Sequence, residues 1–176
     1  MEMMCKEVQD DITTLYKASL SGCTTTLEVL MDRNPRLLNK ISLYSWNETP
    51  LHIAAASHIE ITQALLQAND DACLIPDQDG MLPLHHAARK GRVEVVRALI
   101  SARPDSITQA VLHGGDTILH LCVKDNRLEV LKMFVRYVSD KGEFLNFKDQ
   151  DGNTILHLAV ELKQIEVCYS LFLLDF

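Results

Sequence analysis

Aromatic residues, paired cysteines and long apolar runs are scarce or absent in this sequence. Only 6% of the 176 residues are aromatic, which favours short packed helices over a β-sandwich. No apolar run approaches the roughly 20 residues that span a bilayer, and the acidic N-terminal segment does not resemble a signal peptide. The five cysteines are scattered without a C-x-x-C pair, which argues for reduced thiols and against a disulfide framework or a cysteine zinc site: Cys5, Cys23, Cys73, Cys122 and Cys168.

A basic surface is missing as well. The formal net charge is −7 and the isoelectric point about 5.4, whereas phosphate binding needs a concentrated basic face. The run Arg89-Lys90-Gly91-Arg92 is typical of a solvated helix end. We therefore expect neither nucleic acid nor a membrane to be a partner of this segment. Hydrophobic residues, at 47%, still predict a packed core.

Catalytic motifs are also absent from the sequence. It contains no G-x-S-x-G, no H-E-x-x-H and no G-x-x-x-x-G-K-[ST]. Gly114-Gly115 is interpreted as a turn, and Cys122 as a small buried hydrophobic residue. We predict no catalytic residue, no cofactor and no bound metal. An enzyme or a metal site on a helical scaffold is the remote alternative.

What the sequence does contain is one phrase repeated four times. Its histidines are 33, 35 and 37 residues apart. A period in this range indicates a repeat architecture. The copies are Thr49-Pro50-Leu51-His52, Leu82-Pro83-Leu84-His85, Thr117-Ile118-Leu119-His120 and Thr154-Ile155-Leu156-His157.

A second phrase keeps the same period, and each of its glutamates follows a repeated histidine by eight or nine residues. Two phrases in phase are very unlikely to recur four times by chance. The copies are His58-Ile59-Glu60-Ile61, Arg92-Val93-Glu94-Val95, Arg127-Leu128-Glu129-Val130 and Gln164-Ile165-Glu166-Val167.

The residues inside one copy predict two short helices. A threonine N-cap accepts a hydrogen bond from a free backbone N–H, and proline suits the first helical position. Gly91 supplies the turn into a second helix, whose apolar stripe recurs at helical spacing. Runs such as Asp77-Gln78-Asp79-Gly80 and Asp149-Gln150-Asp151-Gly152 predict tight reversals. One such pair cannot bury its stripe alone, so the copies must stack.

These phrases resemble the ankyrin repeat, which has the signature T-P-L-H-x-A at a period of 33 residues. The resemblance implies an all-α solenoid of stacked helix-turn-helix units with β-turn or hairpin tips, forming a single domain over 1–176. Its units are a degenerate capping repeat (11–48), repeat 2 (49–80), repeat 3 (81–115), repeat 4 (116–152) and a truncated repeat 5 (153–176).

The copies depart from the family pattern at three places. Repeat 2 has lost the turn glycine before His58, which should tighten or distort that turn. Leu82 replaces the threonine cap of repeat 3, which should cost about 1 kcal/mol. The last copy has no polar closing repeat, so we expect it to be less stable than the repeat count suggests.

The spacers resemble one plant branch of the family, as in Asn34-Pro35-Arg36-Leu37-Leu38 and Arg103-Pro104-Asp105-Ser106-Ile107. In that branch a cluster of transmembrane helices, the PGG domain, commonly follows the repeats. This resemblance implies the cytosolic ankyrin part of a plant signalling, defence or stress-response protein. Its location would be cytoplasmic, at the cytosolic face of a membrane in a longer form. The alternative is a soluble adaptor or regulator with no membrane domain.

The repeated histidines do not predict a shared metal ion. Stacking places them roughly 10 Å apart by helix-packing distance, whereas zinc bonds are about 2 Å long. The family resemblance implies that each ring forms hydrogen bonds within its own turn and to the adjacent repeat. His85 and His86 point to different faces of one helix, so ligation by that pair is also not expected.

The resemblance places a protein-binding site on a concave face formed by the turn tips and the exposed edges of the first helices. Trp46 is the best single hot-spot candidate, or else it packs on Tyr44 and covers the first repeat. Arg89 and Lys90 suit an acidic partner, or else form a solvated helix end. The face comprises Tyr44, Trp46, Glu48, Gln78, Asp79, Met81, Arg89, Lys90, His113, Asp116, Lys124, Asp125, Gln150, Asp151 and Asn153, and it extends to Glu161 and Leu162.

Overall fold

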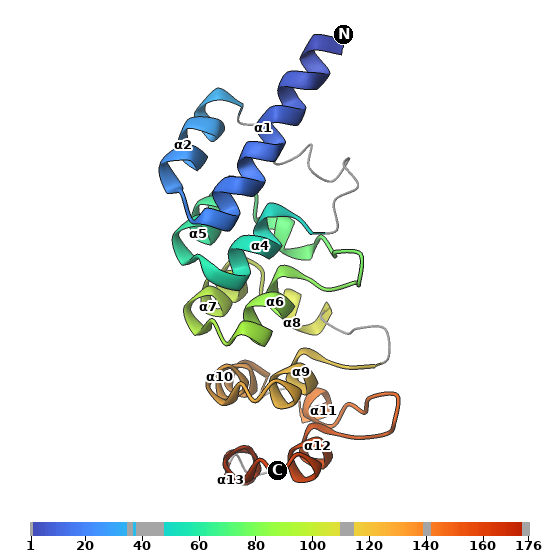
Figure 1. The fold of residues 1–176 in the computed structure, drawn as a ribbon. Coiled ribbons are helices and arrows are strands. Elements are labelled where there is room, and N and C mark those ends of the chain that lie inside the picture. Colours follow the sequence, from blue (N-terminus) through green and yellow to red (C-terminus); the bar gives the residue numbers. More distant parts are fainter. Residues whose placement is uncertain (1, 35–36, 38–47, 110–114, 139–141, 174–176) are drawn as a thin grey trace.

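The computed structural model describes residues 2–34, 37, 48–109, 115–138 and 142–173, with side chains from residue 9 onward except at 109, 142 and 143. Within these residues the chain forms helix pairs that stack one above another (Figure 1). The all-α repeat fold is therefore confirmed. The pairs are α1 (Glu2–Ser21) with α2 (Thr24–Arg33), α4 (Pro50–Ser57) with α5 (Ile59–Ala68), α6 (Pro83–Lys90) with α7 (Val93–Ala102), α9 (Ile118–Lys124) with α10 (Leu128–Val138), and α12 (Ile155–Glu161) with α13 (Ile165–Phe172).

Each helix of a pair packs against its counterpart in the neighbouring pair. The first helices follow one another in the order α1, α4, α6, α9 and α12, and the second helices in the order α2, α5, α7, α10 and α13. Short helical turns η1 (Asp70–Leu74), α8 (Ser106–Gln109) and α11 (Gly142–Leu145) follow the second helices. Helix α1 begins well before residue 11, where the first repeat is predicted to start.

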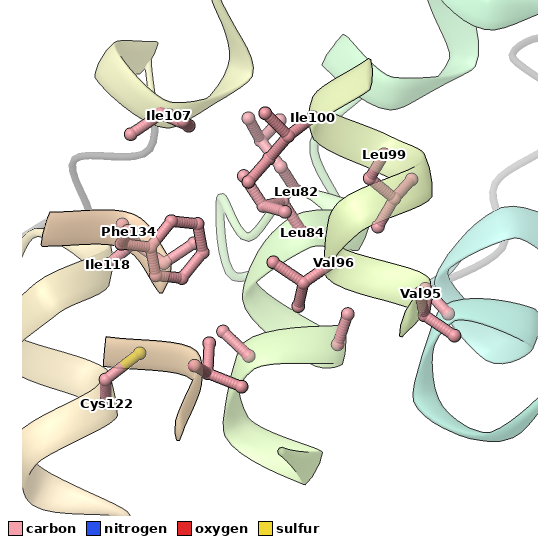
Figure 2. Close-up of a cluster of buried hydrophobic side chains, with 14 of the residues drawn as sticks. Leu82, Leu84, Val95, Val96, Leu99, Ile100, Ile107, Ile118, Cys122 and Phe134 are labelled. Carbon is pink, nitrogen blue, oxygen red and sulfur yellow. The ribbon is translucent and has the colours of Figure 1, made fainter. Parts of the chain in front are cut away.

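The core runs between the two columns of helices. Figure 2 shows its central part, with Val96 and Leu99 of α7 among the buried side chains of one cluster. Phe134 of α10, in the next pair, is fully buried in the same cluster. Burying a side chain of this size stabilises the fold by about 1.5–3 kcal/mol. The predicted stripe of α7 is buried except at Val93, which is half-buried.

The turn between the two helices of a pair contains a left-handed residue in four of the five pairs. Gly91 has φ of 71°, and Asn126 and Lys163 occupy the same position with φ of 53° and 55°. The pair α4 and α5 lacks this residue, as the missing glycine predicts. His58 instead ends α4 and begins α5 with φ of −128°. The deletion therefore shortens the turn and leaves no positive-φ residue between Ser57 and Ile59.

The last helix pair exposes apolar side chains that the internal pairs bury. Phe172 is 82% exposed, whereas the equivalent Val135 is 2% exposed. Val160 is 63% exposed and its equivalent, Val123, is fully buried. A groove of about 570 Å³ opens beside Phe172 on this face. Among the described residues, no further helix covers this end of the stack.

None of the described helices is both long enough and apolar enough to cross a membrane.

Candidate protein-binding surface

The histidines of the repeated phrase join one helix pair to the next. The Nδ1 of His52 accepts a hydrogen bond from the backbone N–H of Thr49 over 3.1 Å. Its Nε2 lies 2.9 Å from the carbonyl oxygen of Met81, in the next repeat. A carbonyl oxygen can only accept, so Nε2 carries the proton and Nδ1 is the acceptor. The Thr49 hydroxyl, 2.7 Å from Nδ1, therefore donates to the ring.

His120 repeats this arrangement in the fourth copy. Its Nδ1 accepts from the N–H of Thr117 over 3.2 Å, and its Nε2 donates to the carbonyl of Asn153 over 3.1 Å. Both histidines thus have the hydrogen bonds that the ankyrin resemblance implies. The threonine hydroxyl takes part in these caps, and that of Thr117 lies 2.8 Å from Nδ1 of His120.

In the third copy, Leu82 replaces the threonine at the helix N-cap. The N–H of Leu82 still donates to Nδ1 of His85, over 2.7 Å. The leucine side chain is 5% exposed and lies in the core cluster with Leu84 and Ile100 (Figure 2). Apolar burial therefore offsets the missing hydroxyl.

A second set of hydrogen bonds runs in the opposite direction along the stack. The first residue of the second phrase donates from its side chain to a carbonyl near the end of the preceding first helix. Arginine is not required, because a histidine and a glutamine also have this contact. The bonds are His58 Nε2 to Leu20 (3.1 Å), Arg92 Nε to Ala56 (3.2 Å), Arg127 Nε to Arg89 (2.7 Å) and Gln164 Nε2 to Val123 (2.7 Å).

The described residues of the predicted binding face are mostly exposed, and we call them the tip face. The loops before α6 and α12 project from the same side of the stack (Figure 1). Tyr44, Trp46 and His113 lie outside the described residues. Gln78, Asp79, Arg89, Lys90, Lys124, Gln150 and Asp151 are exposed, and Glu48, Met81, Asp116, Asp125 and Asn153 are half-buried; Glu161 and Leu162, at the edge, are exposed.

Ion pairs neutralise much of the charge on the tip face. Arg89 Nε lies 3.2 Å from a carboxylate oxygen of Asp125 in the next repeat, and its Nη1 lies 3.9 Å from the sulfur of Met81. Lys124 donates to both carboxylate oxygens of Asp116 over 2.8 Å. Helix ends and turn tips that are far apart in sequence are thus in contact. Arg89 is therefore paired with a carboxylate of the array itself.

Near one end of the tip face, His86 lies between two carboxylates, a cluster that the sequence did not predict. Its Nε2 lies 2.8 Å from Oδ2 of Asp77, and its Nδ1 lies 3.9 Å from Oε1 of Glu48. The ring of His52 packs edge-on against His86, with centroids 5.2 Å apart. The sequence does contain one sign of this cluster: His86 stands where the other copies have the aliphatic residues Ile53, Leu121 and Leu158.

Burial and hydrogen bonding set the protonation states in this cluster. Burial lowers the pKa of His52 from 6.5 to about 4, so its ring is neutral at pH 7. Burial also tends to raise the pKa of Asp77, but hydrogen bonds from His86 and from the amides of Met81 and Asp79 bring that pKa below its usual value. Asp77 is therefore ionised, and its Oδ1 accepts from both amides.

The described cysteines are free thiols. Cys122 is almost fully buried, which raises the pKa of its thiol, and it packs in the core as the sequence predicts.

Comparison with known proteins identifies the repeat. Residues 15–110 and 102–175 match the family model described as ankyrin repeats in three copies. The chain belongs to the ankyrin repeat family. Ankyrin repeats mediate binding to other proteins, so this array is a protein–protein interaction module.

Several relatives share the array. The chain is 32% identical over 152 residues to the nuclear factor NF-kappa-B p105 subunit of Gallus gallus, covering 84% of this chain and 15% of that protein. It is 30% identical over 122 residues to a protein of Oryza sativa named probable E3 ubiquitin-protein ligase XBOS33, covering 69% of this chain and 23% of that one. A Saccharomyces cerevisiae protein named probable 26S proteasome regulatory subunit p28 is 28% identical over 164 residues, which is 89% of this chain and 69% of that one. The array thus spans less than a quarter of the first two relatives.

Proposed function

We propose that the tip face of this ankyrin array binds a segment of another protein and catalyses no reaction. The proposal rests on the different roles of two sets of polar side chains. The repeated histidines form hydrogen bonds within the scaffold, whereas tip side chains such as Asp79 and Asp151 extend into solvent. The two described tip turns before α6 and α12 are closed by backbone amides that donate to Asp77 and Asp149, so their tip side chains are available for contact.

Charge reversal at two tips tests this proposal. In a variant with Asp79→Lys and Asp151→Lys, the turn hydrogen bonds remain, because residues 79 and 151 contribute only their amides to those turns. The matched control exchanges Glu94 and Arg97, an exposed ion pair of 3.6 Å on α7. Affinity capture from an extract of the source organism, with quantitative mass spectrometry, would identify the partners that wild type retains and compare their retention by the tip variant and the control.

We expect the tip variant to retain at least tenfold less of such a partner, with an unchanged circular dichroism spectrum. Equal capture by the tip variant, together with loss in the α7 control, would place the binding surface on the second helices. Trp46→Ala is a separate arm of the experiment, because Trp46 remains a sequence-based hot-spot prediction.

We further propose that the array is the cytosolic part of a plant signalling, defence or stress-response protein that is anchored to a membrane in its full length. The support is the resemblance of its spacers to the plant branch, together with its similarity to the rice protein. The second candidate is a soluble adaptor or regulator in the cytoplasm. It is favoured by the similarity to a protein named as a proteasome regulatory subunit.

Sequencing the transcript beyond the codon for Phe176 separates these two candidates. Several closely spaced apolar runs of about 20 residues would support the membrane-anchored form. A stop codon, together with a diffuse cytoplasmic signal from a fluorescent fusion, would support the soluble adaptor.

A further inference from the structure

His86 occupies a position where the array otherwise has an aliphatic residue. The equivalent residues in the other copies are Ile53, Leu121 and Leu158. Ile53 and Leu121 are half-buried and Leu158 is buried, so the scaffold needs only an apolar side chain there. A histidine at this position is not explained by packing.

The fold brings His86 to two other groups that bind metals. One ligand atom each from His52, Asp77 and His86 can be chosen so that the three atoms lie within 4.8 Å of one another. The three residues come from different parts of the chain: α4, the turn tip that follows η1, and α6. Two imidazoles and one carboxylate are a donor set that suits Zn²⁺.

In each of the three side chains, the polar atom that does not bind the metal lies near another polar group of the protein, as is typical of metal ligands. Oδ1 of Asp77 accepts from two backbone amides, which leaves Oδ2 directed at His86. Nδ1 of His52 lies 2.7 Å from the hydroxyl of Thr49. Nδ1 of His86 faces the carboxylate of Glu48 at 3.9 Å.

We propose that His52, Asp77 and His86 form a zinc site between the second and third repeats, with Glu48 orienting the ring of His86. The ion binds Nε2 of each histidine and Oδ2 of Asp77, and water completes a four-coordinate shell. The neutral His52 ring moves its proton from Nε2 to Nδ1 through solvent, and Nε2 of His86 releases to solvent the proton that it donates to Asp77. The proton on His52 is then donated to the Thr49 hydroxyl, and the proton on His86 faces Glu48.

Zinc binding replaces two hydrogen bonds that hold the metal-free form. His52 gives up its 2.9 Å bond to the Met81 carbonyl, and His86 gives up its 2.8 Å bond to Asp77. The Thr49 amide also loses Nδ1 of His52 as its acceptor. These losses make the affinity moderate. The two imidazole ligands favour Zn²⁺ over Ca²⁺ or Mg²⁺, because oxygen-seeking cations gain little from imidazole nitrogen.

The array contains a natural counterpart that lacks the second histidine and has Asp116, paired with Lys124, in place of Glu48. In the last two repeats, His120 donates to the carbonyl of Asn153, as His52 does to that of Met81. Asp149 accepts from the amides of Asp151 and Asn153 over 3.0 and 2.8 Å, as Asp77 does from its own turn. Leu158 stands where His86 stands in the site, so this second frame should not bind zinc.

Calorimetric titration of the purified chain with Zn²⁺ at pH 7.5 tests the site, and Co²⁺ absorption provides an independent spectroscopic readout. We expect one ion per wild-type chain and tetrahedral Co²⁺ bands. His86→Leu should retain the helical circular dichroism spectrum, because leucine occupies this position elsewhere in the array, and should bind at least tenfold more weakly. Adding Leu158→His to His86→Leu should restore one site in the other frame.

Three results would overturn the site. They are no heat of binding with 100 µM Zn²⁺ and the wild-type chain, equal affinity in wild type and His86→Leu, or equal affinity in His86→Leu and the double variant. The zinc site does not depend on the proposed partner binding, because each of these measurements uses the purified chain and the metal alone.

Discussion

Arg127 donates a hydrogen bond from its Nε to the backbone carbonyl of Arg89 over 2.7 Å, and so joins the start of α10 to the end of α6. Its counterpart Gln164 donates to Val123 over the same distance. This contact explains why the second phrase recurs with the same period as the first. A polar side chain at its first position links each helix pair to the preceding one.

Replacing Arg127 separates its hydrogen bond from its charge. Arg127→Gln should be tolerated, because glutamine performs this role at Gln164. Arg127→Met keeps much of the aliphatic stem and loses the donor, so we expect it to lower the free energy of unfolding by about 1 kcal/mol. Urea denaturation followed by circular dichroism measures both. Equal stability of the two variants would mean that the contact contributes only packing.

Position in the stack should decide how much each repeated histidine contributes. His120 is fully buried and bonds both its own turn and the next repeat, so His120→Ala should cost about 3 kcal/mol. His157 is exposed and bonds only Thr154 among the described residues, so His157→Ala should cost about 1 kcal/mol. Urea midpoints of the two variants give the comparison. An equal loss would argue against the inter-repeat bond as the source of the difference.

Acid should destabilise the array through His52. Burial lowers the pKa of this ring to about 4 in the folded chain, while in the unfolded chain it stays near 6.5. The neutral ring therefore stabilises the fold above pH 6.5, and this contribution is lost as the pH falls from 6.5 to 4. The total is about 3 kcal/mol. Asp77, whose pKa is also lowered, contributes stability that is fully present above its ordinary value of 3.8 and is lost only as the pH falls below that value.

Unfolding free energies measured between pH 7.5 and 4 should show this loss in wild type. His52→Gln is the matched control, since glutamine does not titrate, and its stability should vary much less over the same window. A parallel decline in both proteins would assign the pH dependence to other groups.

Leu82→Thr distinguishes the sequence-based expectation from the structural one. By pattern alone, restoring the threonine should stabilise the array by about 1 kcal/mol. In the structure Leu82 is 5% exposed, so losing its apolar side chain costs about 2 kcal/mol. We therefore expect net destabilisation by about 1 kcal/mol in thermal or urea unfolding. A more stable variant would show that the hydroxyl contact to His85 outweighs the burial.

The exposed apolar end should promote self-association. Val160→Lys combined with Phe172→Lys places charge at two positions that are 63% and 82% exposed. Because neither side chain packs in the core, the melting temperature should stay within a few degrees, while association at high concentration decreases. Light scattering coupled to gel filtration measures the association. A large drop in melting temperature would instead mean that these side chains stabilise the last repeat.

The repeat could be predicted from the sequence because local rules and a common period agreed. The phrase Thr-Pro-Leu-His, the left-handed position at Gly91 and the apolar stripe of α7 each act over a few residues, and the structure has all of them in the predicted places. The altered turn before His58 could also be predicted, since the deletion of one residue changes only that turn.

The surface was harder to predict, because its properties depend on pairs of residues far apart in the chain. Arg89 was predicted either to suit an acidic partner or to form a solvated helix end, and the fold places Asp125, 36 residues away, against it. Leu82 looked like a missing cap until the core enclosed it.

The sequence by itself determined the repeat type, the helix pairs and the order of stacking, since these follow from local propensity and periodic burial. Only the tertiary structure decided which polar groups meet between repeats. His86 is the clearest case. It lies nine residues after Asp77 and 34 after His52, and no local rule links these positions. Stacking brings them together because α4 packs against α6 and the turn that contains Asp77 lies beside both helices.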